Sequence, residues 1–134
     1  MLLLTTVVSG CSKPADDRIK TYPITGEIVV DGKPAASLPI TLHRVNGIDP
    51  QHPTVSSAMT DENGKFSVST YEANDGAPVG EYILTFSWGE LNRLSMQYEG
   101  DKLKGRYSTP ETSKFRVKVE DKPIDMGKIE LTTK

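Results

Sequence analysis

Apolar and polar residues alternate in short runs from Tyr22 onward, which is the pattern of β-strands with one buried face. In the first run, every second residue from Tyr22 to Val30 is apolar or glycine. The same reasoning predicts seven short strands, over residues 22–30, 38–42, 55–60, 65–69, 81–88, 115–119 and 129–131. No run has the length and period of a long helix. The pattern therefore predicts an all-β protein.

Turn-forming residues separate these predicted strands. Asp31 and Gly32 favour the positive φ angles of a tight turn, and residues 61–64 (DENG) are expected to close a hairpin into the strand that follows. The inward positions include four large aromatic residues that supply apolar surface to a small core, namely Tyr82, Phe86, Trp88 and Phe115. The expected fold class is a seven-stranded antiparallel β-sandwich.

The first ten residues follow a different pattern and are followed by Cys11, the only cysteine of the chain. An apolar run (MLLLTTVV) is followed by the small residues Ser9 and Gly10. Signal peptidases require small side chains beside the bond that they cut. The sequence VSGC resembles the bacterial lipobox, which implies that residues 1–10 are a signal peptide and that Cys11 is the site of lipid attachment. Because each buried methylene contributes about 0.8 kcal/mol, two or more acyl chains would anchor the protein stably in a membrane.

Residues 11–21 are polar and lack periodicity, so we expect them to form the lipidated cysteine and a flexible tether ahead of a β domain over residues 22–134. No basic residue precedes the apolar run, and the run is only about eight residues long. Both features fit a true start upstream of Met1. Two alternative interpretations remain. The protein is exported by another route, or residues 1–11 are an ordinary N-terminus with an incidental free thiol. A transmembrane helix would need about 20 apolar residues.

Composition narrows the possible functions. A nucleic-acid-binding surface needs a concentrated basic face, and the formal net charge of -2 gives no indication of one. A single cysteine excludes an internal disulfide and a cysteine-based zinc site. The two histidines, His43 and His52, leave little material for a metal centre. We expect no nucleic-acid partner, no metal and no cofactor, and the oligomeric state is left open.

Three short motifs, in order, carry a family resemblance: GEIVVDGKPA (residues 26–35), TDENGKF (60–66) and PVGEY (78–82). The wider pattern adds YEANDGAPVGEYILTFSW (71–88) and DKLKGRYSTPETSKF (101–115). Together they resemble transthyretin-like, carboxypeptidase-regulatory-like domains, and with the lipobox they resemble small lipoproteins of planctomycete bacteria. The resemblance covers nearly all of residues 22–131. It implies a secreted, membrane-tethered β-sandwich of the cell envelope without established catalysis. Ser12 is not the acidic residue that retains some lipoproteins in the inner membrane, so an outer-membrane location is expected where the host follows that rule.

The segment 89–113 is long for a connection between strands, which often indicates a purpose. Leu91, Leu94 and Tyr98 have helix-like spacing, so a short turn or helix is expected to pack there. We favour a cover over one end of the sandwich, with Leu91, Leu94 and Leu103 inserted as a plug. The alternative is a partner-binding loop for a glycan or peptide, whose candidate contact residues are Arg93, Tyr98, Lys104, Arg106 and Tyr107.

Two other charged motifs have simpler explanations than a site. Residues 61–64 lack the spaced oxygen ligands and closing glutamate of a calcium loop, so a turn is favoured. Lys114, Arg116 and Lys118 form a basic row on one face of a strand. Such a row could meet anionic glycans or lipid headgroups, but charges on a solvated face also protect a sheet edge from pairing.

The sequence offers little for catalysis. His43 lies on the polar face of its strand and His52 lies between prolines, so neither is placed as an oriented base. The transthyretin-like fold also houses a hydroxyisourate hydrolase, but its C-terminal YRGS motif is absent and this chain ends in ELTTK. The favoured function is a non-enzymatic, lipid-anchored envelope protein with a structural or binding module. The alternative is a carbohydrate- or peptide-binding accessory module that presents the 89–113 loop.

Overall fold

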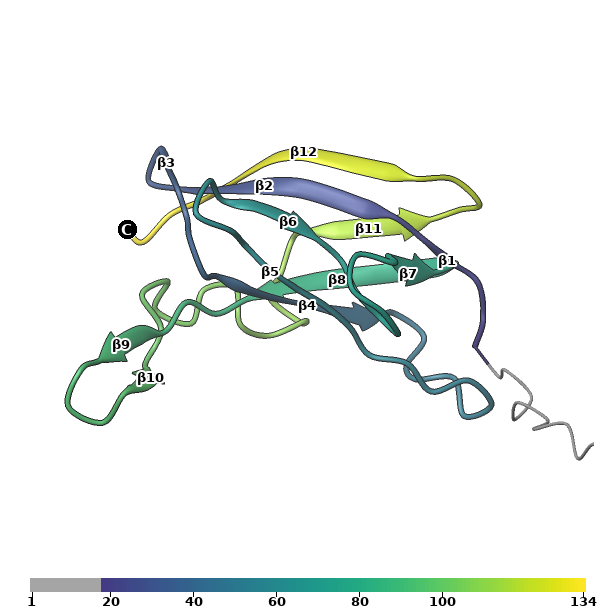
Figure 1. Cartoon of the computed structure of the whole chain (residues 1–134), viewed down its shortest axis with the longest axis horizontal. Helices are drawn as coiled ribbons and strands as arrows, with labels where there is room; N and C mark the ends of the chain where they lie inside the picture. Colours follow the sequence, from purple (N-terminus) through teal and green to yellow (C-terminus); the bar gives the residue numbers. More distant parts are fainter. Residues whose placement is uncertain (1–17) are drawn as a thin grey trace, which may run out of the picture.

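The computed structural model describes residues 18–134, which form an all-β fold without helices (Figure 1). One sheet has the strand order β11-β8-β4-β5, formed by Arg116–Val119, Gly80–Phe86, Pro39–Arg44 and Ser56–Met59. The other has the order β12-β2-β3, formed by Ile124–Leu131, Ile24–Val30 and Lys33–Pro34, and β6 (Lys65–Ser67) also pairs with β2. Two short ribbons join β1 (Thr21–Tyr22) to β7 (Ala77–Pro78) and β9 (Glu90–Asn92) to β10 (Gln97–Glu99).

The strand count and one pairing direction differ from the prediction. Residues 18–134 contain twelve strands. The seven predicted strands correspond to β2, β4, β5, β6, β8, β11 and β12, and the other five have two or three residues each. The expectation of a wholly antiparallel fold is wrong, because β12 runs parallel to β2 with Ile129 beside Ile28. This pairing joins distant parts of the chain, so the local alternation carries no sign of its direction.

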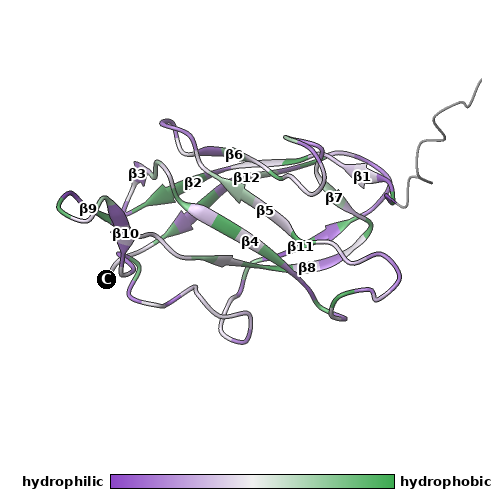
Figure 2. Ribbon diagram, turned by 60° about the horizontal axis from the view of Figure 1, so that its bottom comes forward, coloured by the Kyte–Doolittle hydropathy of each residue, from purple (hydrophilic) through white to green (hydrophobic). Residues whose placement is uncertain are grey.

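The two main sheets lie in two layers around a shared hydrophobic core (Figure 2), an arrangement consistent with a β-sandwich. The inward faces predicted for β2, β4 and β8 are confirmed by the burial of Ile28, Leu42 and Leu84. Aromatic rings meet edge to face in this core, with the Phe86 and Phe115 ring centroids 5.4 Å apart. Trp88 and Phe115 are only partly buried, whereas Tyr82 and Phe86 are enclosed.

The turn after β2 ties down the C-terminus of the chain. Asp31 and Gly32 both have positive φ, 51° and 83°, as the predicted tight turn requires. The Asp31 carboxylate accepts hydrogen bonds from the hydroxyls of Thr132 and Thr133 and from the Thr133 backbone N–H. These bonds, that from the Thr133 hydroxyl first, hold the pKa of Asp31 below its ordinary value.

The turn over residues 61–64 connects the two sheets. Gly64 has a φ of 77°, and a Cβ at this position would lie 2.5 Å from the Ile28 carbonyl oxygen. The two flanking strands belong to different sheets, since β5 pairs with β4 and β6 pairs with β2. The predicted turn is therefore present, and the Asp61 N–H donates to the Lys65 carbonyl at 2.8 Å across it, but the predicted hairpin does not continue as a β5–β6 ladder. Ser57 and Ser69 form one isolated bridge between the two sides.

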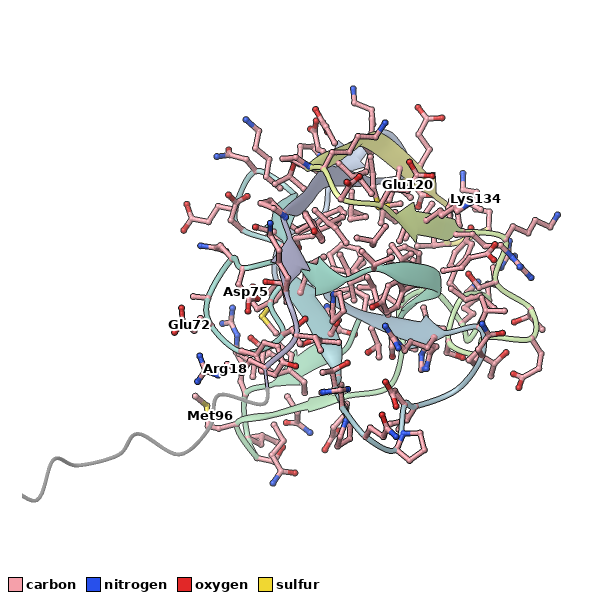
Figure 3. All side chains as sticks on the ribbon, turned by 90° about the vertical axis from the view of Figure 1, so that its right-hand side faces the viewer. Arg18, Glu72, Asp75, Met96, Glu120 and Lys134 are labelled. Carbon is pink, nitrogen blue, oxygen red and sulfur yellow. The ribbon has the colours of Figure 1, made fainter. Side chains whose placement is uncertain are left out.

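The fold has two distinct ends along its long axis. The described chain begins at one end, while the β9–β10 hairpin and the C-terminus lie at the other (Figures 1 and 2). Arg18 already contacts the domain, through an ion pair of 3.2 Å with Glu72 and a cation–π contact with the Tyr71 ring. Figure 3 looks along this axis and shows Arg18 beside Glu72 and Asp75. Cys11 and the predicted signal peptide, residues 1–10, lie outside the described residues.

Asp75 organises the loop that receives Arg18. Its carboxylate accepts backbone N–H groups of Thr70, Tyr71 and Glu72 at 2.7, 2.9 and 3.0 Å. Burial of the carboxylate raises its pKa, but these N–H donors favour the charged form more strongly. The pKa of Asp75 consequently lies below its ordinary value.

This shift predicts an acid-dependent loss of stability. The depressed pKa contributes stability that is present above the unfolded-state pKa, about 3.9, and is lost as the pH falls through the folded-state value. We expect the urea midpoint of the chain to fall between neutral pH and about pH 3. Asp75→Asn should be less stable at neutral pH and should lose less on acidification. An unchanged pH dependence in this variant would contradict the assigned role.

Candidate functional site

The structure does not gather the five residues predicted to bind a partner into one site. Arg93 lies in the turn of the β9–β10 hairpin, and Tyr98 lies in β10 with 65% of its surface exposed. Lys104 and Arg106 are exposed in the turns that follow. Tyr107 lies deeper, against the core.

Tyr107 fixes the packing of this end and is not displayed. Its ring contacts Phe86 edge to face at a centroid distance of 6.3 Å, and it contacts Phe115 at 5.9 Å. Its hydroxyl accepts the Thr132 backbone N–H at 3.1 Å, and its carbonyl oxygen accepts the Phe86 N–H at 2.8 Å. The residue that sequence reasoning placed in an exposed loop thus joins the core to the C-terminus.

Residues 90–99 form a β-hairpin where the apolar spacing predicted a turn or short helix. Leu91 lies directly opposite Tyr98 in the pairing, so both side chains share one face of the hairpin. Asn92 shapes the turn, because its side-chain oxygen accepts the Leu94 N–H at 2.9 Å and its carbonyl accepts the Met96 N–H at 2.7 Å. The helix prediction is wrong because residues 91 and 98 lie on opposite strands of a hairpin.

The predicted plug is correct for only one of its three leucines. Leu103 is fully buried and belongs to the core. Leu94 is 99% exposed at the tip of the hairpin, and Leu91 is 40% exposed. The favoured interpretation of the segment as a cover is therefore wrong for residues 90–99, which project from the domain (Figure 1).

Asp101 holds the base of the hairpin. Its carboxylate accepts the backbone N–H groups of Trp88 and Leu103 at 2.9 Å and that of Gly105 at 3.0 Å. The Trp88 indole N–H donates to the Ala36 carbonyl at 3.0 Å, and the Lys102 ammonium lies 4.3 Å from the Trp88 ring centroid. The only sign of this role in the sequence is the Asp followed closely by Gly in DKLKG, which is a turn signal.

A small apolar pocket separates the hairpin from the edge of the first sheet. Its volume is about 160 Å³, and its lining comes from three parts of the chain, with the residues Ser37, Pro39, Met59, Gly89 and Tyr98. Met59 is 60% exposed and lies opposite Pro39 in the β4–β5 pairing. Gly89 permits the close approach of Tyr98, because a Cβ there would lie 3.1 Å from the Tyr98 Cβ. Met59 carried no sequence signal, since its neighbours come together only in the folded chain.

The chemistry of this pocket suits binding. Apolar carbon and one aromatic face dominate the lining, and the polar groups are the hydroxyls of Ser37 and Tyr98. None of these side chains is a carboxylate, imidazole or ammonium that could carry a proton at neutral pH. Larger hollows of about 390 and 400 Å³ are lined by side chains of both charges, including Lys65, Asp125 and Arg18.

The histidines occupy structural positions. His43 Nε2 lies 2.9 Å from the Thr85 hydroxyl oxygen on the outer face of the first sheet. His52 Nδ1 lies 3.6 Å from a carboxylate oxygen of Asp49 within a surface loop. Neither pair adds a third group that would orient the ring toward a reactive hydroxyl.

Residues 61–64 use their acidic oxygen within the turn. Asp61 Oδ1 accepts the N–H groups of Asn63 and Lys65 at 2.8 and 2.9 Å, as an Asx turn does. Within residues 18–134 no cluster of three or more potential metal-ligating side chains is found. The same residues contain no helix that is long and apolar enough to span a membrane.

The basic row lies on a true sheet edge. Strand β11 is the outermost strand of its sheet and exposes Arg116 and Lys118. Acidic neighbours lie close, with Arg116 3.8 Å from Glu81 and Lys118 3.9 Å from Glu120. The row is thus partly neutralised, which suits protection of an edge against strand pairing.

Comparisons with known proteins leave the family open. No family model and no curated protein matches the chain. Two chains of solved structures match. One is a 9R-lipoxygenase from Cyanothece PCC8801, which is 16% identical, with a TM-score of 0.40 over 90% of this chain and 18% of that chain. At this identity and TM-score the likeness carries no argument about function.

Proposed function

We propose that this chain is a non-enzymatic, lipid-anchored protein of the bacterial cell envelope. In this proposal residues 1–10 direct export, Cys11 carries the acyl chains, and a transthyretin-like β-sandwich serves as a structural or binding module. The two-layered all-β fold and the lipobox-like VSGC sequence support it. An outer-membrane location follows from Ser12 where the host sorts lipoproteins by that position.

The observation that carries the proposal is that the start of the described chain and the β9–β10 hairpin lie at opposite ends of the domain (Figure 1). Seven peptide units separate Cys11 from Arg18, so the anchor and the domain would be at most about 25 Å apart. A domain held this way keeps its anchored end near the membrane and directs the hairpin away from it.

Tyr98 and its pocket favour binding over a purely structural role. A tyrosine that is 65% exposed beside a pocket, on a hairpin fixed at its base by Asp101, is typical of a recognition surface. The second candidate function is therefore a carbohydrate- or peptide-binding accessory module. Both candidates share the same anchor and differ in whether the hairpin end has a ligand.

Cell fractionation tests the anchor. In a bacterial host that processes lipoproteins, the full chain should be recovered in the membrane fraction, and Cys11→Ser should move to the soluble fraction. Ser12→Ala is the matched control and should stay with the membrane. Recovery of Cys11→Ser in the membrane at the level of the unmodified chain would overturn the proposal.

A further inference from the structure

The exposed large apolar side chains of residues 18–134 lie in two groups toward opposite ends of the domain. One group belongs to the β9–β10 hairpin, with Met59 beside it on the small apolar pocket. The other lies at the end where the described chain begins, in the loop between β4 and β5 and directly after β7 (Figure 1). The members of this second group, which we call the apolar rim, are Val45, Ile48, Val55 and Val79.

Strand pairing and a hydrogen bond connect the apolar rim to the start of the described chain. Thr21 pairs with Pro78 in the β1–β7 ribbon, and Val79 follows directly. The guanidinium of Arg44, the residue before Val45, donates to the Val79 carbonyl oxygen at 2.9 Å. The rim and the point where the predicted tether enters the domain are therefore neighbouring parts of one surface.

The loop between β4 and β5 presents two exposed aliphatic side chains side by side. Ile48 is 65% exposed and Val55 is 68% exposed, and both line one hollow of about 310 Å³ together with Tyr82 and other residues. The base of the loop is fixed to the sheet, because the Val45 N–H donates to the Glu81 carbonyl at 3.0 Å. Exposed apolar side chains that are grouped in this way mark a site of contact with a protein or a membrane.

The length of chain ahead of the domain favours the membrane as the occupant. Under the proposed function, the lipid on Cys11 lies in the bilayer, at most about 25 Å along the chain from Arg18. A short tether of this kind gives the second contact an effective concentration in the millimolar range. A weak affinity of the rim for lipid is then sufficient, whereas a free partner protein would have no such advantage.

The charges at this end give no basic cluster that would recognise anionic headgroups. Arg18 forms an ion pair with Glu72 at 3.2 Å, and His52 lies 3.6 Å from Asp49 in the same loop as Ile48. Binding to anionic lipid through charge uses clusters of lysine and arginine. Aliphatic side chains instead suit the boundary between the headgroups and the acyl chains.

We propose that the apolar rim rests on the membrane and inserts Ile48 and Val55 at the boundary between headgroups and acyl chains. The proposal rests on the proposed lipid anchor and adds a second, reversible contact that sets the orientation of the domain. An aliphatic side chain of this size strengthens an association by about tenfold or more when it is fully removed from water. With the rim on the membrane, the β9–β10 hairpin at the other end faces away from it.

Tryptophan quenching on vesicles tests this contact. The full chain is coupled through Cys11, its only cysteine, to phosphatidylcholine vesicles that contain a maleimide lipid and brominated acyl chains, which quench tryptophan at close range. Trp88, the only native tryptophan, lies near the hairpin base and should keep its emission. Ile48→Trp should add an emission that is shifted to shorter wavelength and lost on the brominated vesicles. Leu94→Trp at the hairpin tip is the matched control and should add an emission that is neither shifted nor lost.

A second substitution shows whether the rim itself makes the contact. In the Ile48→Trp chain, Val55→Asp should restore most of the lost emission, because it places a charge at the boundary with the acyl chains, whereas Val55→Leu should leave the quenching in place. If Ile48→Trp does not fold, Val79→Trp on the same rim takes its place. Unquenched emission from the rim tryptophan, or equal quenching at residues 48 and 94, would overturn the proposal and leave the rim to a protein partner.

The coupling separates this inference from the anchor on which it rests. Because the maleimide lipid holds Cys11 at the membrane, the quenching does not depend on acylation by a cell. Unquenched emission would overturn the rim contact and leave the lipid anchor standing. Quenching at residue 48, together with Cys11→Ser that stays in the membrane fraction, would overturn the anchor and leave the affinity of the rim for lipid established.

Discussion

Gly76→Ala is expected to lower the free energy of unfolding by roughly 3 to 5 kcal/mol. A Cβ at this position would lie 1.7 Å from the Tyr22 carbonyl oxygen, so the chain around Tyr22 and Gly76 must separate. Gly76 also has a φ of 91°, donates its N–H to Val68 at 2.8 Å and accepts the Thr70 hydroxyl at 2.7 Å. The clash, the backbone strain and the lost hydrogen bonds act together, and urea unfolding measures their sum.

Gly47→Ala separates the clash from the backbone term. Gly47 also has a positive φ, 78°, but no atom lies within 4 Å of a Cβ built there. It should cost only about 1 to 2 kcal/mol, the penalty of a left-handed alanine. Equal losses in the two variants would show that the β1–β7 contact does not constrain residue 76.

Leu103→Ala is expected to cost about 2 to 5 kcal/mol, the range for a large-to-small change in a packed core. Leu103 is fully buried in the common core, although it lies in a region without strands. Its N–H donates to Asp101 at 2.9 Å and its carbonyl accepts the Arg106 N–H at 3.2 Å, so the local turn holds it in place. A cavity left there cannot collapse easily, because the backbone on both sides is bonded.

Leu94→Ala is the matched control, with the same change of side chain at a position that is 99% exposed. Its effect on the free energy of unfolding should stay within about 0.5 kcal/mol. The comparison uses thermal or urea unfolding of both variants under the same conditions. A loss at Leu94 equal to that at Leu103 would mean that the hairpin tip packs against the domain after all.

The alternation of apolar residues was sufficient for the strands of the core. In β2, β4, β8 and β11 the buried core residues recur at every second position of the strand itself. This period of two can be read from the sequence without knowing which strands lie beside it. The pairing direction of β12 was not visible, because it depends on a contact between Ile129 and Ile28 across a hundred residues. The turn at 61–64 was correctly placed, but the residues of the turn do not determine which sheet each flanking strand joins.

The candidate site was only partly predictable. Tyr98 was correctly singled out as exposed, whereas Tyr107 has the same residue type and lies against Phe86 and Phe115. Met59 lies on the pocket only because β5 and the hairpin base converge in the folded chain. The spacing of Leu91, Leu94 and Tyr98 fits one helix face, yet a hairpin turn within 93–96 brings residues 91 and 98 together on one face as well.

We propose that a lipid anchor at Cys11 holds the domain at the end opposite the hairpin. The mass of the intact protein extracted from bacterial membranes tests it most directly. We expect a chain that begins at Cys11 and carries the added mass of its acyl groups. A membrane-extracted or soluble protein that retains residues 1–10 and carries no added mass would contradict it.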